Sequence, residues 1–176
     1  MKSRFILIPV LSAALSGSAL RAQSPVSSGL QRLVTRASRN LVEAADEMPA
    51  DKYGYKPTPA QMTFGEVVVH LVGGNEMMCG WIAGTPVAEP AKLEPTDPKE
   101  KLVGQLKSSF DHCTTALAGV NDSKLADSVP FFGGRKVTRA MAMLILVDDW
   151  ADHYSQMAIY LRLNGLVPPT AKRKEM

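Results

Sequence analysis

Two polar side chains interrupt an apolar helix face near the C-terminus of the sequence. Asp149 and His153 are spaced i and i+4, so they lie one turn apart on the same side of a helix, and both can reach one bound ion. The predicted stripe is apolar up to Leu146 and continues past the pair with Gln156 and Tyr160. An acid and an imidazole in this position suit either a pair of metal ligands or a buried hydrogen bond.

A third polar side chain, His70, lies in an apolar stretch earlier in the chain. Its neighbours Val67, Leu71 and Gly74 predict a buried helix face. His70 precedes the expected end of its helix by about as many residues as Asp149 and His153 follow the expected start of theirs. If these two helices pack antiparallel, the three side chains reach the same level of the structure.

Three inward polar residues at one depth lose hydration unless they share a partner. Two histidines and an aspartate suit zinc or another borderline transition metal, and three protein ligands leave positions open for water or substrate. The spacing therefore allows a metal site at His70, Asp149 and His153, with Gln156 or Glu66 behind the ligands. The alternative is two hydrogen-bonded pairs without metal, His153 with Asp149 and His70 with Glu66.

Four helices must position these residues. Thr63 and Glu66 fit a capping box, Asp97 before Pro98 fits an N-cap, and Thr138 begins the last helix. Proline-rich links separate the helices, and the one at 85–96 is long enough to cross a bundle from end to end. The pattern predicts an all-α four-helix bundle, with a short hairpin allowed within 125–135. The expected helices cover about residues 27–48, 63–83, 97–117 and 138–163.

The N-terminus has the order of a secretory signal peptide. Basic residues, a short apolar run and small residues follow one another over 1–22. Cleavage is favoured after Ala22, with Ala19 as the second choice. An uncleaved membrane anchor is less favoured, because serines interrupt the apolar run. We expect an exported protein, periplasmic or secreted, with the bundle at 23–169 and a polar tail at 170–176 that frays.

Composition and charge limit the classes of molecule that the protein is expected to bind. The chain has 176 residues and a net charge of +3, but residues 1–22 hold three basic residues and no acid, so the remaining 17 basic and 17 acidic residues balance. A neutral body without a basic stripe argues against nucleic acid as the main partner. No later stretch is long and apolar enough to cross a membrane. We expect a small-molecule substrate. We also expect the protein to be a monomer or a homodimer.

The chain has two cysteines, Cys79 and Cys113. Each follows the expected start of its helix by the same number of residues, so the two are level if the second and third helices run parallel. An oxidising compartment permits a disulfide. The alternative is two separately buried thiols.

Two stretches of the sequence resemble the DinB-like family of four-helix-bundle metalloenzymes. The first runs from YKPTP at 55–59 through TFGE at 63–66 to His70. The second is HYSQMAIYLRLNGLVPP at 153–169. The resemblance covers the chain after 1–22 in order and spacing, and it implies an up-down-down-up bundle with a long crossover between the second and third helices.

The resemblance also implies a site. Members bind a divalent metal, often zinc or nickel, through one histidine on the second helix and two on the last. These positions correspond to His70, Asp149 and His153, and Asp149 stands where the family has histidine. A carboxylate is a competent ligand, and zinc, nickel and iron are the candidate metals. Characterised members include metal-dependent thiol transferases and an isomerase. A divalent-metal-dependent enzyme of hydrolase or transferase type is the first hypothesis, and a metal-free helical module that binds a small ligand or a protein is the second.

Overall fold

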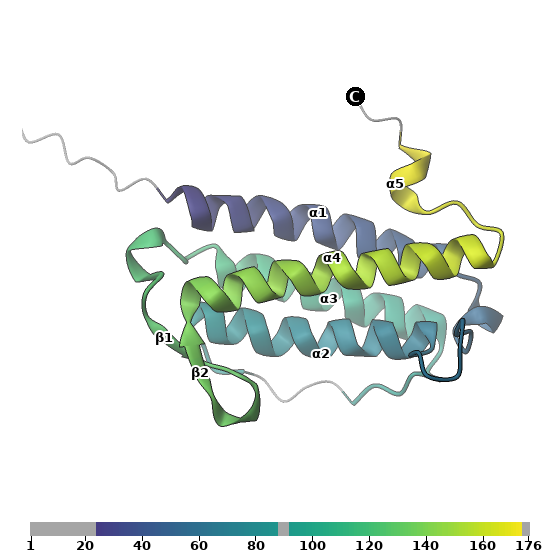
Figure 1. The fold of residues 1–176 in the computed structure, drawn as a ribbon, viewed down its shortest axis with the longest axis horizontal. Helices are drawn as coiled ribbons and strands as arrows, with labels where there is room; N and C mark the ends of the chain where they lie inside the picture. The colour runs from purple at the N-terminus through teal and green to yellow at the C-terminus, as the bar shows by residue number, and fades with distance from the viewer. Residues whose placement is uncertain (1–23, 88–91, 174–176) are drawn as a thin grey trace, which may run out of the picture.

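Four long helices form the bundle in the computed structural model, which describes residues 24–87 and 92–173. The predicted signal peptide at 1–22 lies outside the described residues. The first and last long helices run in one direction and the two between them run in the other (Figure 1), so the predicted up-down-down-up order is confirmed. The long helices are α1 (Pro25–Glu47), α2 (Phe64–Ala83), α3 (Lys99–Leu117) and α4 (Arg139–Leu163).

Each long helix packs against two others, in the ring α1, α3, α2, α4. α2 and α3 lie side by side and run parallel, so the segment between them must return along the full length of the bundle (Figure 1). α2 and α4 pack antiparallel. This is the arrangement in which His70, Asp149 and His153 were expected to reach the same level of the bundle. Among the described helices, none is both long enough and apolar enough to span a membrane.

The helix starts show which capping signals hold. Thr63 accepts from the backbone N–H of Glu66, and the Glu66 carboxylate accepts from that of Thr63, so the predicted capping box is confirmed. Thr138 caps α4 as expected. The predicted N-cap at Asp97 is wrong: α3 begins at Lys99 after Pro98. The Asp97 carboxylate instead accepts from the backbone N–H of Glu94 and from Lys101 Nζ, which hold it in the preceding turn.

A two-stranded hairpin joins α3 to α4, as the sequence allowed. β1 (Ser128–Pro130) pairs antiparallel with β2 (Lys136–Thr138), with Val129 opposite Val137. Gly133 and Gly134 turn the tip with positive φ, which glycine adopts without strain. Phe131 and Phe132 precede this turn and pack with Trp81 of α2. The short elements are η1 (Ala50–Lys52), η2 (Asp122–Lys124), η3 (Phe132–Gly134) and α5 (Pro169–Lys172).

Residues 170–173 of the expected polar tail pack against the bundle, whereas 174–176 lie outside the described residues. α5 lies beside α1, where Lys172 Nζ is 2.5 Å from the Glu47 carboxylate and Arg173 Nη1 is 3.4 Å from that of Glu43. Tyr154 of α4 donates its hydroxyl to Thr170 at 2.8 Å. Residues 170–173 therefore contact both α1 and α4.

The two cysteines form a disulfide. Cys79 and Cys113 are both fully buried, with their Cα atoms 5.1 Å apart. The bond links the parallel helices α2 and α3 across 34 residues of sequence. The sequence left open either a disulfide or two separately buried thiols, and the structure contains the disulfide.

The start of α1 is held by a side chain far along the chain. The Asp122 carboxylate accepts from the backbone N–H groups of Val26 and Ser27 at 3.0 and 2.8 Å, and from the Ser27 hydroxyl. Partial burial opposes the charge of Asp122, but these hydrogen bonds outweigh it and hold the pKa of the carboxyl below its usual value. Asp122 thus satisfies N–H groups that the helix itself leaves without partners.

Gly65, in the first turn of α2, is expected to tolerate no side chain. A Cβ there would overlap the carbonyl oxygen of Pro95 in the crossover. Gly65→Ala should therefore lower the free energy of unfolding by about 1–3 kcal/mol, as overpacked sites do. Gly73→Ala in the same helix meets nothing within 4 Å and should be neutral or stabilising by up to about 1 kcal/mol. Urea denaturation of the two variants tests this, and equal stabilities would contradict it.

Candidate metal centre

The structure brings His70, Asp149 and His153 together between α2 and α4. Asp149 Oδ1 lies 3.3 Å from His70 Nε2 and 3.3 Å from His153 Nε2. The imidazole rings are 4.5 Å apart between centroids, at 61°. One donor atom from each residue lies within 4.8 Å of the other two. Both histidines therefore meet one carboxylate oxygen. In the alternative of two separate pairs, His70 would meet Glu66, but the Glu66 carboxylate is engaged at the helix cap.

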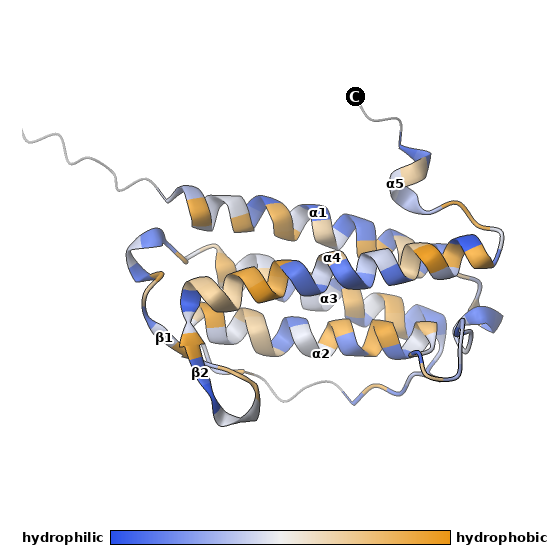
Figure 2. Ribbon diagram, viewed as in Figure 1, coloured by the Kyte–Doolittle hydropathy of each residue, from blue (hydrophilic) through white to orange (hydrophobic). Residues whose placement is uncertain are grey.

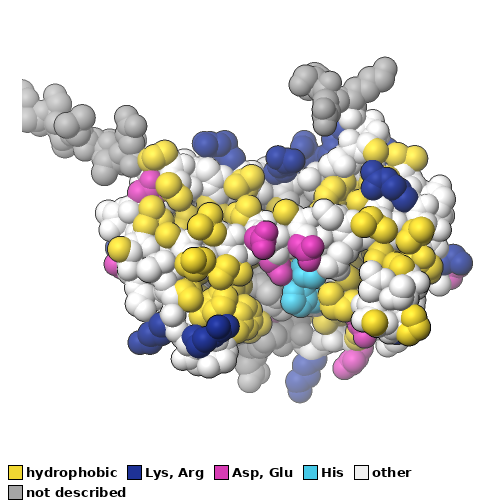
Figure 3. All heavy atoms as spheres, in the orientation of Figure 1, with side chains coloured by type: hydrophobic (Ala, Val, Ile, Leu, Met, Phe, Trp, Pro, Cys, Tyr) yellow, Lys and Arg dark blue, Asp and Glu magenta, His cyan; other side chains and the backbone are white. Residues whose placement is uncertain are grey.

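His70, Asp149 and His153, called the trio below, lie where the molecular surface meets the bundle interior. The His153 side chain is 8% exposed, that of Asp149 30% and that of His70 48%. The ribbon of α4 is apolar toward both ends and polar in the middle (Figure 2). Acidic and histidine side chains reach the surface at the centre of the same face (Figure 3). The group is thus anchored on the buried side and open to small molecules on the other.

A buried hydrogen-bond network sets the rotation of α4. Trp150 Nε1 donates to Asn75 Oδ1 of α2 at 2.7 Å, and Asn75 Nδ2 donates to Ser109 Oγ of α3 at 2.9 Å. All three residues are buried, where an unpaired polar group would be costly. Because Trp150 is fixed toward the core, its neighbour Asp149 faces α2.

Gln156 fixes the proton position on His153. Gln156 Nε2 donates to the Asp152 carboxylate at 2.9 Å, so its Oε1 is the atom 3.3 Å from His153 Nδ1. That oxygen accepts, so Nδ1 carries a proton. In a neutral imidazole the lone pair is then on Nε2, which points at Asp149. A lone pair facing a carboxylate requires a cation between them, either a proton or a metal ion.

The charges of the trio agree with this geometry. Burial alone would raise the pKa of Asp149, but hydrogen bonds from His153 and His70 outweigh it and hold that pKa far below its usual value. Burial likewise opposes the charged form of His153, yet the hydrogen bond to Asp149 raises the pKa of the imidazole. Asp149 therefore remains an anion that attracts a cation between itself and the histidines.

The donor set fits a tetrahedral transition metal. With metal–ligand bonds of 2.0–2.1 Å, tetrahedral geometry places neighbouring donor atoms about 3.3–3.4 Å apart. Both distances from Asp149 Oδ1 are 3.3 Å, and rotation of the half-exposed His70 can adjust the third. Asp152 and Gln156 behind His153 form the kind of outer support that orients a ligating imidazole. These residues fit a borderline metal such as zinc.

A small pocket of about 70 Å³ adjoins the trio. His70 and Asp149 form its polar wall. In the described part of the chain, no lysine or arginine lines it. Phe132 of the hairpin also lines the pocket. No periodicity in the sequence indicates this contribution. The apolar wall consists of Gly74, Met78, Phe132, Ile145 and Leu146.

Fold and site together define a class of protein, a helical bundle with a His-Asp-His cluster between its second and last long helices. Residues 33–157 match the model of the DinB superfamily, and the chain belongs to that superfamily. The predicted family is thereby confirmed. Among curated protein sequences, none matches the chain.

Solved structures share the fold at low sequence identity. A DinB-like protein from Bacillus subtilis is 21% identical with a TM-score of 0.63, over 78% of this chain and 92% of that one. A DinB-like protein from Bacillus cereus is 18% identical with a TM-score of 0.66, over 81% and 95%. A mycothiol-dependent maleylpyruvate isomerase is 11% identical with a TM-score of 0.58, over 74% and 60%. These likenesses establish the bundle fold.

Proposed function

We propose that the protein is an exported member of the superfamily that binds a divalent transition metal through His70, Asp149 and His153, and that it is a metal-dependent enzyme of hydrolase or transferase type. The observation that carries the metal site is the convergence of one donor atom from each of the three residues within 4.8 Å of one another. Gln156 holds the proton of His153 on Nδ1, and Asp149 Oδ1 lies 3.3 Å from Nε2 of both histidines. A cation between these atoms satisfies all three.

Each residue of the proposed metal site has a separate role. A bound divalent ion supplies Lewis-acid polarisation and lowers the pKa of a coordinated water or thiol. Asp149 compensates the charge of the ion, and buried His153 fixes its position. Half-exposed His70 supplies the ligand on the solvent side. The Asp152–Gln156 pair keeps the His153 ring in its ligating orientation.

The pocket beside the trio favours a small substrate with an uncharged, apolar group. Met78, Phe132 and Ile145 offer only apolar surface, so this pocket suits an apolar group of a substrate held beside the metal. The mycothiol-dependent isomerase among the structural neighbours depends on a thiol, which supports a small thiol as a candidate co-substrate. A thiol partner of this protein would be one available outside the cytosol.

Metal content and metal affinity test the proposal. The protein, purified without a metal-chelating tag, should contain or take up one equivalent of Zn²⁺, Ni²⁺ or Fe²⁺. Metal at 100 times its Kd should raise the free energy of unfolding by about 2.7 kcal/mol. With Co²⁺ bound, an absorption spectrum that shifts on adding a small thiol would reveal an open coordination position.

His112 of α3 provides the control for this experiment, since it lies outside the cluster. His112→Ala should bind metal like the wild type, whereas His153→Ala should not. A wild-type protein that binds none of the three metals would contradict the proposal. It would leave the second hypothesis, a metal-free module in which Asp149 pairs with charged histidine.

Gln156 is expected to tune metal affinity without touching the ion. Gln156→Ala should weaken metal binding about 10- to 100-fold, the usual effect of removing a partner behind a ligating histidine. Isothermal titration with Zn²⁺ measures this, with Ser155→Ala as the control on the outer side of α4. Equal affinities of the two variants would exclude the proposed role of Gln156.

Export is tested by the mature N-terminus. When the full chain is expressed in a bacterium, mass spectrometry of the extracytoplasmic fraction should find a protein beginning at Gln23, or at Leu20 for the second cleavage choice. The buried Cys79–Cys113 disulfide supports this location, since such bonds persist in oxidising compartments. An intact N-terminus in the cytoplasmic fraction would refute the proposed export.

A further inference from the structure

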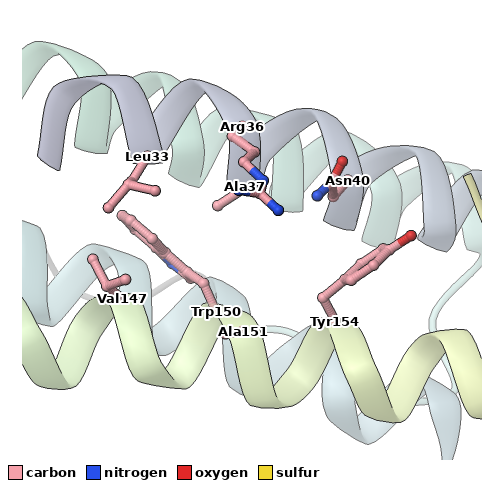
Figure 4. Close-up of a pocket in the computed structure, with 8 residues that line it drawn as sticks. All are labelled: Leu33, Arg36, Ala37, Asn40, Val147, Trp150, Ala151 and Tyr154. Atoms are coloured by element: carbon pink, nitrogen blue, oxygen red, sulfur yellow. The ribbon is translucent and has the colours of Figure 1, made fainter. Parts of the chain in front are cut away.

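A groove between α1 and α4 lies on the side of α4 that faces away from the metal centre. It consists of two pockets of about 270 and 310 Å³, which share Leu33 and Val147 as lining residues. Figure 4 shows the first pocket, with Leu33, Ala37 and Asn40 on one wall and Val147, Trp150 and Tyr154 on the other. Together the pockets have the volume of an ordinary small-molecule site.

One end of the groove is apolar and open to solvent. Val26 is 50% exposed there and Leu144 66%. Leu30, Met143 and Leu125 complete that wall. Apolar side chains in a concave site gain free energy when a hydrocarbon group displaces water from them. This end therefore suits an alkyl chain.

The other end carries hydrogen-bond donors. Arg36 extends from α1 into the space between the helices (Figure 4), and it pairs with no carboxylate in the part of the chain that the structure describes. Asn40 is 7% exposed. Its Oδ1 accepts from Arg173 at 2.6 Å, so the free side of the amide is its Nδ2 donor group. The Tyr154 hydroxyl is engaged with Thr170.

We infer that this groove binds a straight-chain carboxylate, with the alkyl chain along Leu33 and Val147 and the carboxylate on Arg36 and Asn40. Guanidinium and amide N–H groups are the donors that recognise a carboxylate. From Val26 to Arg36, α1 rises about 15 Å, which suits a chain of about the length of dodecanoate. The inference is independent of the proposed metal function, because no lining residue belongs to the His-Asp-His group.

Fluorescence titration tests the groove directly. Trp150 lines it, so a Trp81→Phe protein, kept in EDTA, reports binding through Trp150 alone. Dodecanoate, below its micelle concentration, should change the emission saturably with one site. Dodecyltrimethylammonium, which has the same chain and the opposite charge, should bind at least about tenfold more weakly because its head group would face Arg36.

Matched arginine variants separate recognition from general attraction to positive charge. In the same background, Arg36→Gln should weaken dodecanoate binding about tenfold, whereas Arg39→Gln, on the same helix outside the lining, should change it less than about twofold. Circular dichroism of each variant verifies folding. Equal effects of the two substitutions, or equal binding of the two amphiphiles, would overturn the inference.

Sedimentation of the same samples tests the competing occupant. If a second copy of the chain covers this face, the protein forms a dimer that dodecanoate neither enters nor dissociates, and the inference is overturned. A protein whose sedimentation is unchanged by dodecanoate while Trp150 responds agrees with binding in the groove.

Discussion

Asp149→Ala is expected to reduce the affinity for Zn²⁺ at least about a hundredfold, since even partners behind a ligand are worth 10- to 100-fold. Asp149 supplies the oxygen that lies 3.3 Å from both imidazoles and the negative charge that compensates the ion. The remaining two histidines face each other with no carboxylate between them. Isothermal titration of the metal-free protein measures the loss.

Two variants show whether the effect belongs to the ligand. Asp148→Ala removes the adjacent, exposed carboxylate and should bind Zn²⁺ like the wild type. Asp149→His restores the three-histidine set implied by the family resemblance and should keep affinity well above that of Asp149→Ala. If Asp148→Ala is as weak as Asp149→Ala, the acidic surface in general, rather than the trio, attracts the metal.

Removal of the disulfide should cause the largest loss of stability. Cys79 and Cys113 close a loop with a sequence separation of 34, and chain entropy assigns about 3–4 kcal/mol to a loop of that length. Both positions are fully buried between α2 and α3, so substitution by alanine frees the unfolded chain and also removes two sulfur atoms from the packed interior. We expect the double variant Cys79→Ala/Cys113→Ala to unfold at a correspondingly lower urea concentration.

A reducing agent separates the bond from the packing. The wild type in TCEP should approach the double alanine variant in stability, and the variant itself should not respond to TCEP. If reduction leaves the urea midpoint of the wild type unchanged, the bond contributes nothing to the folded state and the prediction fails.

The sequence brought the trio together through periodicity and helix length, and the resemblance to the DinB-like family favoured the interpretation as a metal site. The i,i+4 spacing placed Asp149 and His153 on one face, and the apolar neighbours of His70 placed it inward. Antiparallel packing of α2 and α4 brought the two helices to the same level. Each signal depends on periodicity or helix length, and both survive in a bundle regardless of detailed packing.

The remaining features depend on contacts between distant segments. Asn75 is buried because Trp150 and Ser109 satisfy its amide, and no local pattern indicates such partners. Phe132 reaches the pocket through the register of the hairpin. Asp97 has the residue type of an N-cap, but its hydrogen bonds to Glu94 and Lys101 compete with capping. Residue type gave the candidates, and tertiary structure chose among them.

The hold of Asp122 on the first turn of α1 also orders the assembly of the chain. Val26 and Ser27 obtain their acceptor only from a residue about two-thirds of the way along the polypeptide. Until Asp122 has been made, these two N–H groups can bond only to water, so the first turn of α1 lacks this cap even when α1, α2 and α3 are complete. The first turn of α1 therefore gains the stabilisation from Asp122 only after about two-thirds of the chain has been synthesised.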